Sequence, residues 1–357
     1  MANKIKVLVI DDSAMVRQIL EKGLAMDGGI EVVGTASDPY VARDKIIELN
    51  PDVLTLDVEM PRMDGVEFLR KLMPQHPIPV VMVSSLTQKG RAITLDALEA
   101  GAVDFISKPT SNVVDGLNSM IMELRTKIKI ASTANVSHWK NKRFDAAGAN
   151  VNRKKPSTVA LDETTHKIIA IGASTGGTEA LKSVIDELPS TSPGVVIVQH
   201  MPEVFTKMYA DRLNQSAAMQ VVEAKDGETV VPGKVLIAPG GLHMELVRTG
   251  GIYKVRCFTA DRVNGHCPSV EVLFKSVAKC AGKNSIGIIL TGMGNDGALG
   301  MLDMKNSGSM LNIAQDEKTC VVFGMPKEAI AANAVHEVLP LDKIAGRVIS
   351  FLRGFNG

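Results

Sequence analysis

The sequence predicts an α/β protein made of two doubly wound domains, each with a central parallel sheet. First, the chain has 357 residues, the length of two or three ordinary domains. Second, short β-branched runs alternate with amphipathic segments in two separate blocks, the pattern of repeated βαβ units. Third, aromatic residues make up only 4% of the chain while glycine reaches 31 residues, which suits aliphatic sheets joined by tight turns.

Composition excludes several classes of protein. Apolar residues account for 45% and charged residues for 22%, so a disordered, collagen-like or coiled-coil chain is excluded. The formal net charge of +1 gives no global field toward nucleic acid or an anionic membrane. The four cysteines form no C-x-x-C pair, so no zinc knuckle or thioredoxin motif is predicted. No apolar run approaches the ~18 residues of a membrane span and no signal peptide is recognisable, so we expect a cytoplasmic protein without membrane insertion.

The first block is expected to fold as one domain over residues 1–124. Its strands are short β-branched runs, as buried parallel strands require, and amphipathic segments lie between them. Right-handed crossovers then place helices on both faces of the sheet. We predict strands over 5–10, 53–56, 80–83 and 102–106, and helices over 14–26 and 66–73.

A basic stretch separates the two blocks. Between residues 125 and 155 the chain carries nine basic residues and one acid, with few periodic apolar positions. We predict a flexible linker over residues 125–164. A nucleic-acid arm is the alternative, but no helix-turn-helix pattern or aromatic interleaving accompanies the charge, so no nucleic-acid partner is expected.

The second block is predicted to be a second doubly wound domain over residues 165–357. Its strands are again short and rich in β-branched residues, with helical patterns between several of them. We predict strands over 168–171, 195–198, 235–238, 286–290 and 310–314, and helices over 179–188 and 270–281.

Polar side chains follow several strands of the first block. Asp11 and Asp12 follow the first strand, Asp57 the next, and Ser84 and Lys108 follow the later ones. The carboxyl ends of parallel strands meet at one edge of a sheet, where ligands bind. Three carboxylates there repel one another unless a cation lies among them, and such hard oxygen donors suit Mg²⁺. A lysine and a hydroxyl beside that cation would cradle a phosphoryl group.

Over roughly residues 4 to 123, this block resembles the receiver domain of two-component response regulators. A flavodoxin-like fold is the implication. Five separated motifs match in order, which makes the resemblance specific. They are Asp11-Asp12, Asp57, Met60-Pro61 with Asp64-Gly65, Ser84 and Lys108-Pro109.

The resemblance implies a role for each of these side chains. Asp57 would accept a phosphoryl group from a histidine kinase. Asp12, Asp57 and the backbone carbonyl of Glu59 would hold Mg²⁺, with Asp11 helping through water. Lys108 and Ser84 would contact the phosphoryl oxygens. Phe105 stands where the family keeps its switch aromatic, and the Lys108-Pro109 bond resembles the family's cis peptide.

A serine in the second block stands where a nucleophile could lie. The first strand runs into Gly172-Ala173-Ser174-Thr175-Gly176-Gly177, a G-x-S-x-G match at the entrance to a helix. Glycines permit a close backbone approach, and the helix start supplies unpaired N–H groups. Taken alone, the motif is equally a helix cap.

Two further polar residues follow other strands of this block. His200 comes after the run that ends at Gln199, and Asp296 comes after the 286–290 strand and a glycine-rich loop. If these strands neighbour the strand before Ser174, serine, imidazole and carboxylate would emerge on one edge. His200 could then take the Ser174 proton while Asp296 orients the ring.

Two alternatives remain open on residues alone. The chain order of α/β-hydrolases would make the triad Ser174, Asp296 and His336, while His243 and His266 could line the pocket. In the other alternative, Gly292 to Gly297 fits G-x-G-x-x-G, and Asp316 lies where a ribose-binding acid is expected, so a dinucleotide-binding sensor is possible.

The second block resembles the catalytic domain of the chemotaxis protein-glutamate methylesterases. The matching strings are IGASTGG (171–177), VIVQHM (196–201), Ala238-Pro239-Gly240-Gly241 with His243, Pro268-Ser269-Val270 and LTGMGNDGA (290–298). A Rossmann-like three-layer fold is implied. The triad would be Ser174, His200 and Asp296, with the Met293 N–H as oxyanion donor and Thr175 supporting the site. One departure is Glu271, where the family usually has Asp; we expect little consequence.

Together the two resemblances imply a phosphorylation-activated serine hydrolase of chemotactic adaptation. It would demethylate glutamate γ-methyl esters on chemoreceptors, release methanol, and deamidate selected receptor glutamines. A chemotaxis histidine kinase would be the phosphodonor and methyl-accepting chemoreceptors the substrates. We expect a monomer with Mg²⁺ in the receiver domain and no cofactor in the catalytic domain. The unphosphorylated receiver domain would cover the catalytic cleft.

Overall fold

The computed structural model describes residues 4–85, 87–108, 113–141 and 166–354. By its internal contacts the chain divides into two compact units, residues 1–149 and 150–357. Both are α/β units with parallel sheets, which confirms the predicted fold class. Among the described helices, none is long and apolar enough to cross a membrane.

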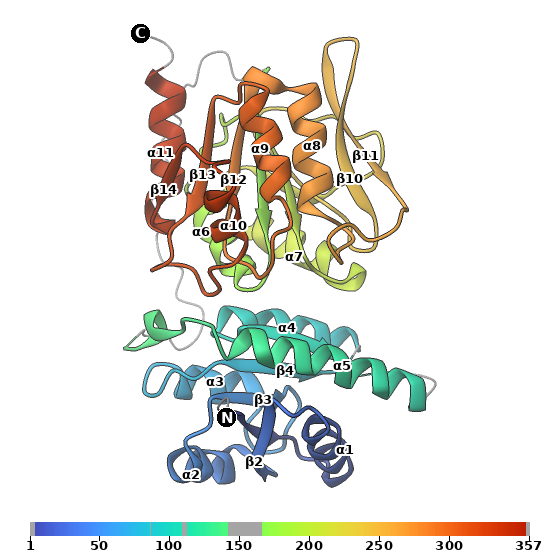
Figure 1. The fold of residues 1–357 in the computed structure, drawn as a ribbon, viewed down its shortest axis with the longest axis vertical. Coiled ribbons are helices and arrows are strands. Elements are labelled where there is room, and N and C mark those ends of the chain that lie inside the picture. The colour runs from blue at the N-terminus through green and yellow to red at the C-terminus, as the bar shows by residue number, and fades with distance from the viewer. Residues whose placement is uncertain (1–3, 86, 109–112, 142–165, 355–357) are drawn as a thin grey trace. The chain divides into compact units, whose positions relative to one another are not determined.

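The first unit is a five-stranded sheet with the strand order β2-β1-β3-β4-β5, and all its strand pairs are parallel. Helix α1 packs beside α5, and α3 beside α4. Figure 1 shows the elements of this unit in blue to green. In chain order they are β1 (Ile5–Ile10), α1 (Ala14–Ala25), β2 (Ile30–Ala36), α2 (Pro39–Leu49), β3 (Val53–Asp57), α3 (Gly65–Leu72), β4 (Val80–Ser84), α4 (Gln88–Glu99), β5 (Asp104–Ser107), α5 (Val113–Ala131) and η1 (Ser137–Trp139).

Burial explains why the predicted strands form. Strands β3 and β4 are buried at every position, and β1 over its last four residues, because helices cover the sheet. Strand β2 has an exposed or half-buried interior, so its apolar pattern was too weak to be predicted. It is an edge strand of the sheet, which is consistent with its mixed burial.

The predicted start of the linker at residue 125 is wrong. Helix α5 continues to Ala131 because Leu124, Ile128 and Ala131 present a fully buried apolar stripe at helical spacing. The chain then turns back onto the unit. The Trp139 ring is 2% exposed, and a Cβ on Gly101 would lie only 3.0 Å from it. The rest of the predicted linker, from 142 to 164, lies outside the described residues.

The second unit has a seven-stranded parallel sheet in the order β14-β13-β12-β6-β7-β9-β8 and a separate antiparallel pair, β10 with β11. Figure 1 shows the pair as a long hairpin beside α8. The elements are β6 (Ile168–Ala173), α6 (Gly177–Glu187), β7 (Gly194–Gln199), α7 (Glu203–Ser216), β8 (Gln220–Glu223), β9 (Lys234–Ile237), β10 (His243–Thr249), β11 (Ile252–Phe258), α8 (Val270–Cys280), η2 (Gly282–Asn284), β12 (Ser285–Ile289), α9 (Ala298–Asn306), β13 (Leu311–Gln315), α10 (Met325–Ala331), β14 (Glu337–Leu339) and α11 (Leu341–Gly354).

The five strands predicted for this unit are all present, as β6, β7, β9, β12 and β13. Strand β6 lies at the centre of the sheet between β12 and β7, with which it pairs in parallel. The segments that follow these three strands therefore emerge at the same edge of the sheet, and they carry Ser174, His200 and Asp296.

Candidate active site and acidic site

Ser174 stands on the turn between β6 and α6. Its N–H donates to the carbonyl of Thr291 at 3.0 Å, and its carbonyl accepts from the Gly177 N–H at 2.7 Å. Gly176 has φ 77°, and a Cβ there would lie 2.6 Å from the Cβ of Val321. Only glycine fits this turn, which holds the serine at the carboxyl end of the central strand.

His200 connects the serine to the carboxylate. Its Nδ1 lies 3.1 Å from Ser174 Oγ, and its Nε2 lies 2.8 Å from Asp296 Oδ2. The backbone places the ring, because the His200 N–H donates to the carbonyl of Ala173 on the neighbouring strand at 3.1 Å. The structure thus brings together all three residues that the sequence analysis named.

The protonation of Asp296 determines which nitrogen of His200 carries the proton. Burial opposes the charge on Asp296, but hydrogen bonds from His200, Asn264 and Ser269 outweigh it and lower its pKa to about 2. An ionised carboxylate only accepts hydrogen bonds, so Nε2–H of His200 must be the donor. Nδ1 then presents its lone pair to the Ser174 hydroxyl. The two nitrogens exchange the roles they have in chymotrypsin-like proteases.

Further donors surround Asp296, and the exposed one, Asn264, was not predicted from the sequence. Its Oδ1 accepts from Asn264 Nδ2 at 2.9 Å and from Ser269 Oγ at 2.7 Å, and its Oδ2 accepts from the Val270 N–H at 2.7 Å. The Asn-Gly pair at 264–265 is a turn signal visible in the sequence. Nothing in the sequence places that turn against Asp296.

The loop after β12 carries the predicted oxyanion donor. Met293 is 45% exposed, and among the residues described its N–H donates no backbone hydrogen bond. A Cβ on Gly292 would lie 2.7 Å from Ser174 Cβ, so the loop packs directly against the serine. Thr175 is 8% exposed, and its carbonyl accepts from Thr291 Oγ1 at 2.9 Å.

His336, the alternative base, forms a hydrogen bond outside the triad. His336 precedes the edge strand β14, and its Nδ1 accepts from the Asn312 N–H at 2.8 Å. Of the two other histidines considered as pocket residues, His266 stacks on the His200 ring. His243 is 1% exposed, and its Nε2 lies 2.9 Å from the carbonyl oxygen of Asp261.

The residues of the G-x-G-x-x-G match are engaged within the unit. Gly292 packs against Ser174, and a Cβ on Gly297 would collide with Val270. The Asp296 side chain faces His200, and Asp316 Oδ1 accepts from the N–H and hydroxyl of Thr319. These contacts favour an active-site loop over a dinucleotide-binding turn.

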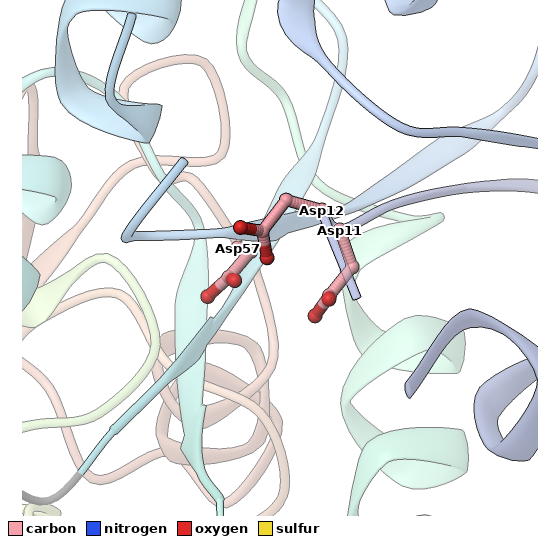
Figure 2. A group of neighbouring side chains, drawn as sticks. All are labelled: Asp11, Asp12 and Asp57. Carbon is pink, nitrogen blue, oxygen red and sulfur yellow. The ribbon is translucent and has the colours of Figure 1, made fainter. Parts of the chain in front are cut away.

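The first unit carries an acidic site where β1 and β3 end. Figure 2 shows Asp11, Asp12 and Asp57 gathered there, and one carboxylate oxygen from each lies within 4.8 Å of the others. Lys108 Nζ lies 2.9 Å from Asp11 Oδ2 and 3.0 Å from Asp57 Oδ2. The structure thus brings four of the predicted residues together. Asp12 is exposed, so solvent reaches the cluster.

Asp57 is the most strongly perturbed carboxyl of this site. Burial raises its pKa to about 6; the charge of Asp11 acts in the same direction, and Lys108 opposes both. Burial lowers the pKa of Lys108, but the charges of Asp57 and Asp11 outweigh it and raise that pKa above its usual value. The site therefore holds more negative charge than one lysine compensates.

The other predicted residues of the acidic site have separate surroundings. Ser84 ends β4, where its hydroxyl accepts from Thr94 Oγ1 at 2.6 Å, a partner that sequence reasoning missed. Glu59 follows Asp57 by two residues and is exposed. Phe105 is 6% exposed within β5. Pro109, and with it the predicted cis bond, lies outside the described residues.

Comparison with known proteins assigns a family to each unit. Residues 169–348 match the family described as CheB methylesterase, and residues 7–147 match the response regulator receiver domain. The chain belongs to the CheB methylesterase family. Its methylesterase domain contains Ser174, His200 and Asp296, and its receiver domain contains the acidic site.

Two curated relatives match nearly the whole chain, and a solved structure matches its second half. A protein-glutamate methylesterase/protein-glutamine glutaminase of Syntrophotalea carbinolica is 62% identical over 99% of both chains. One from Sulfurimonas denitrificans is 52% identical over 98% of both. The crystal structure of the Thermotoga maritima CheB methylesterase catalytic domain covers 52% of this chain and 98% of its own, with 41% identity and a TM-score of 0.51.

Proposed function

We propose that this chain hydrolyses glutamate γ-methyl esters and deamidates selected glutamines on chemoreceptors, under control of its receiver domain. The observation that carries the proposal is the hydrogen-bonded chain from Ser174 through His200 to Asp296 in a methylesterase domain. The names of the full-length relatives supply the substrate class.

The first step is acylation of Ser174. Its Oγ attacks the γ-carbonyl carbon while its proton passes to His200 Nδ1, 3.1 Å away. Asp296 stabilises the imidazolium that forms. The N–H of Met293 donates to the oxyanion, an interaction that in other hydrolases contributes ~3 kcal/mol. The carbon–oxygen bond to the methoxy group then breaks, and His200 returns the proton to release methanol.

Deacylation regenerates the serine. Water attacks the acyl-enzyme and His200 takes a proton from it. His200 returns this proton to Ser174 Oγ as the bond between that oxygen and the acyl carbon breaks, and the glutamic acid product ionises to the carboxylate. With glutamine as substrate, ammonia leaves in place of methanol, and the remaining steps are the same. Both reactions need one nucleophile and no cofactor in the catalytic domain.

In the receiver domain, Asp57 is the proposed phosphoryl acceptor and a histidine kinase the proposed donor. The carboxylates of Asp11, Asp12 and Asp57, with the Glu59 backbone carbonyl, are hard oxygen donors that fit Mg²⁺. The bound ion would neutralise charge on the phosphoryl oxygens. Lys108 would pair with those oxygens, and Ser84 would donate a hydrogen bond to one of them.

Phosphorylation of Asp57 is the proposed means of regulating the esterase activity. A phosphoryl group adds roughly −1.5 to −2 charges and new acceptor oxygens at Asp57, enough to change how a domain surface binds. We expect the unphosphorylated receiver domain to restrict access to Ser174. We also expect a monomer that acts in the cytoplasm and binds no nucleic acid.

The deciding experiment is methanol release from methylated chemoreceptor membranes. Ser174→Ala removes the nucleophile, and such a loss lowers kcat on the order of 10⁶-fold in a well-studied serine protease. Methanol release should fall to background, while receiver phosphorylation continues. Ser190→Ala, at an exposed serine in the same domain, is the matched control and should keep full activity. Normal turnover by Ser174→Ala would contradict the proposal.

A further inference from the structure

A tight turn between β11 and α8 touches two members of the triad. The backbones of Val263 and His266 exchange two hydrogen bonds, each 3.0 Å long. The central residues Asn264 and Gly265 have φ 52° and 82°. Two positive φ angles in an Asn-Gly pair are typical of a type I′ turn, one of the commonest two-residue connections between antiparallel segments.

Two side chains of this turn contact the active site. Asn264 donates to Asp296 Oδ1 at 2.9 Å. The His266 ring lies on the His200 ring with centroids 3.6 Å apart and only 10° between their planes. Residues 263–266 therefore contact the acid and the base of the triad at once.

Hydrogen bonds from residues near the start of β10 also hold the turn in place. The carbonyl of Asp261 accepts from Nε2 of His243, a side chain that is 1% exposed. Just after the turn, the Cys267 carbonyl accepts from the Gly241 N–H at 3.3 Å. The segment that starts β10 thus anchors both sides of the turn, although residues 264 and 265 are themselves exposed.

We propose that residues 263–266 position the catalytic base, and that His266 is the residue that holds the His200 ring in place. This rests on the proposed role of His200. Hydrogen bonds at Nδ1 and Nε2 fix two points of the His200 ring. Hydrogen bonds resist displacement out of the ring plane only weakly, and rotation about the two side-chain torsions of His200 permits such displacement. A parallel ring 3.6 Å away blocks that motion on one face.

The stacking also distinguishes between the two charge states of His200. Two neutral aromatic rings avoid direct face-to-face contact, whereas a cation is attracted to an aromatic face. His200 becomes an imidazolium when it takes the Ser174 proton. The His266 ring therefore stabilises the state that leads through the transition state more than the resting state, which lowers the barrier.

The test compares His266→Ala with His266→Phe in the full-length protein. Two rates are measured: methyl ester hydrolysis, and labelling of Ser174 by a fluorophosphonate, in which an Oγ–P bond forms, fluoride leaves and His200 takes the proton. We expect His266→Ala to lower kcat and the labelling rate about 10- to 100-fold, because small misplacements of reacting groups have effects of this size. KM should change less than about twofold.

His266→Phe keeps a flat ring and should recover most of both rates. The control His166→Ala, at an exposed histidine in the same domain, should match the wild type. Wild-type rates for His266→Ala, or equal losses for the Ala and Phe variants, would overturn the proposal. If the wild type is labelled but hydrolyses no methyl ester, the proposed function fails while the labelling comparison still decides the role of His266.

A backbone variant tests the turn itself. Gly265→Ala places a Cβ at φ 82°, which strains the turn, and should slow labelling as His266→Ala does. Gly250→Ala introduces similar strain at φ 58° in the β10–β11 hairpin turn and should leave the labelling rate unchanged. Melting temperatures of both variants are measured alongside. Equal labelling losses in both would show a general loss of stability and would overturn the positioning role.

Discussion

Asp57 is ionised in surroundings that oppose its charge. Its side chain is almost fully buried, and Asp11, on the adjacent strand end, adds a second negative charge. Lys108 contacts both carboxylates and is the only cation that the structure places on them among the described residues. A site with this excess of negative charge favours binding of a further cation, and without one it lowers the stability of the receiver domain.

This arrangement predicts that Asp57→Asn stabilises the receiver domain at neutral pH. The pKa of Asp57 is about 6 in the folded domain against 3.8 in the unfolded chain, so the native state holds the proton more tightly between those values. Stability therefore falls as pH rises from about 4 to 6, by on the order of 2–3 kcal/mol, and stays low above 6. Asparagine has no such titration. Calorimetry of both proteins at pH 4 and pH 7.5 checks this.

Magnesium provides the control for that prediction. Mg²⁺ should raise the melting temperature of the wild-type receiver domain more than that of Asp57→Asn, because a ligand that binds only the native state stabilises it. A melting temperature of Asp57→Asn below that of the wild type at pH 7.5 would contradict the assignment of Asp57 as an unfavourable buried charge.

Single residues differ in how far the sequence reveals them. Ser174, His200 and Asp296 follow buried strands, and the rule for parallel sheets predicted that they would meet if those strands were neighbours. The choice of His200 over His336 came from the family resemblance. Asn264 and His266 follow no strand of that sheet. Their place depends on how a loop after the β10–β11 hairpin folds over the site, and only tertiary contacts fix that.

At the scale of elements, the main error concerned α5 and the segment after it. Basic residues there suggested a solvated linker, but two of those on α5 form ion pairs within the receiver domain. Lys127 lies 2.8 Å from Asp104, and Lys129 lies 2.6 Å from Asp27. A run of basic residues does not indicate which acidic residues they pair with. The apolar spacing of Leu124, Ile128 and Ala131, in contrast, would have indicated a helix.

Strands were predicted in proportion to their burial. Strands β6, β7, β12 and β13 are buried throughout and were all recognised from apolar runs. The edge strands β8 and β14 and the β10–β11 hairpin mix exposed and buried positions, so they lack a continuous apolar signal.

The end of α5 leads to a prediction about Trp139. This residue is the only tryptophan of the chain, is 2% exposed and packs against Gly101. Trp139→Ala should destabilise the receiver domain by about 3–5 kcal/mol, since it empties a packed site. Trp139→Phe should lose less. Denaturant unfolding followed by circular dichroism measures both, and unchanged stability of Trp139→Ala would show that this segment is not part of the folded domain.

At the scale of the whole molecule, two complete sites lie in two separate units. The net charge of +1 conceals this division, because basic residues concentrate around residues 125–155 while acidic ones gather at sites such as that of Asp57. The order of the two domains could be predicted from motifs, since each motif set is local in sequence. Neither set of motifs indicates how the receiver domain regulates the methylesterase domain, so this regulation has to be measured.

Phosphorylation should therefore change methylesterase activity only when both sites are intact. We expect an acyl phosphate, used as a small phosphodonor with Mg²⁺, to raise methanol release by the full-length protein about 5- to 150-fold, the usual range of coupling between two sites. Asp57→Asn should show no rise, because it lacks the acceptor oxygen. A fragment that starts at Lys155 should exceed the unphosphorylated full chain and ignore the phosphodonor. Equal rates for the fragment and the unphosphorylated full chain would mean that the receiver domain does not restrict Ser174.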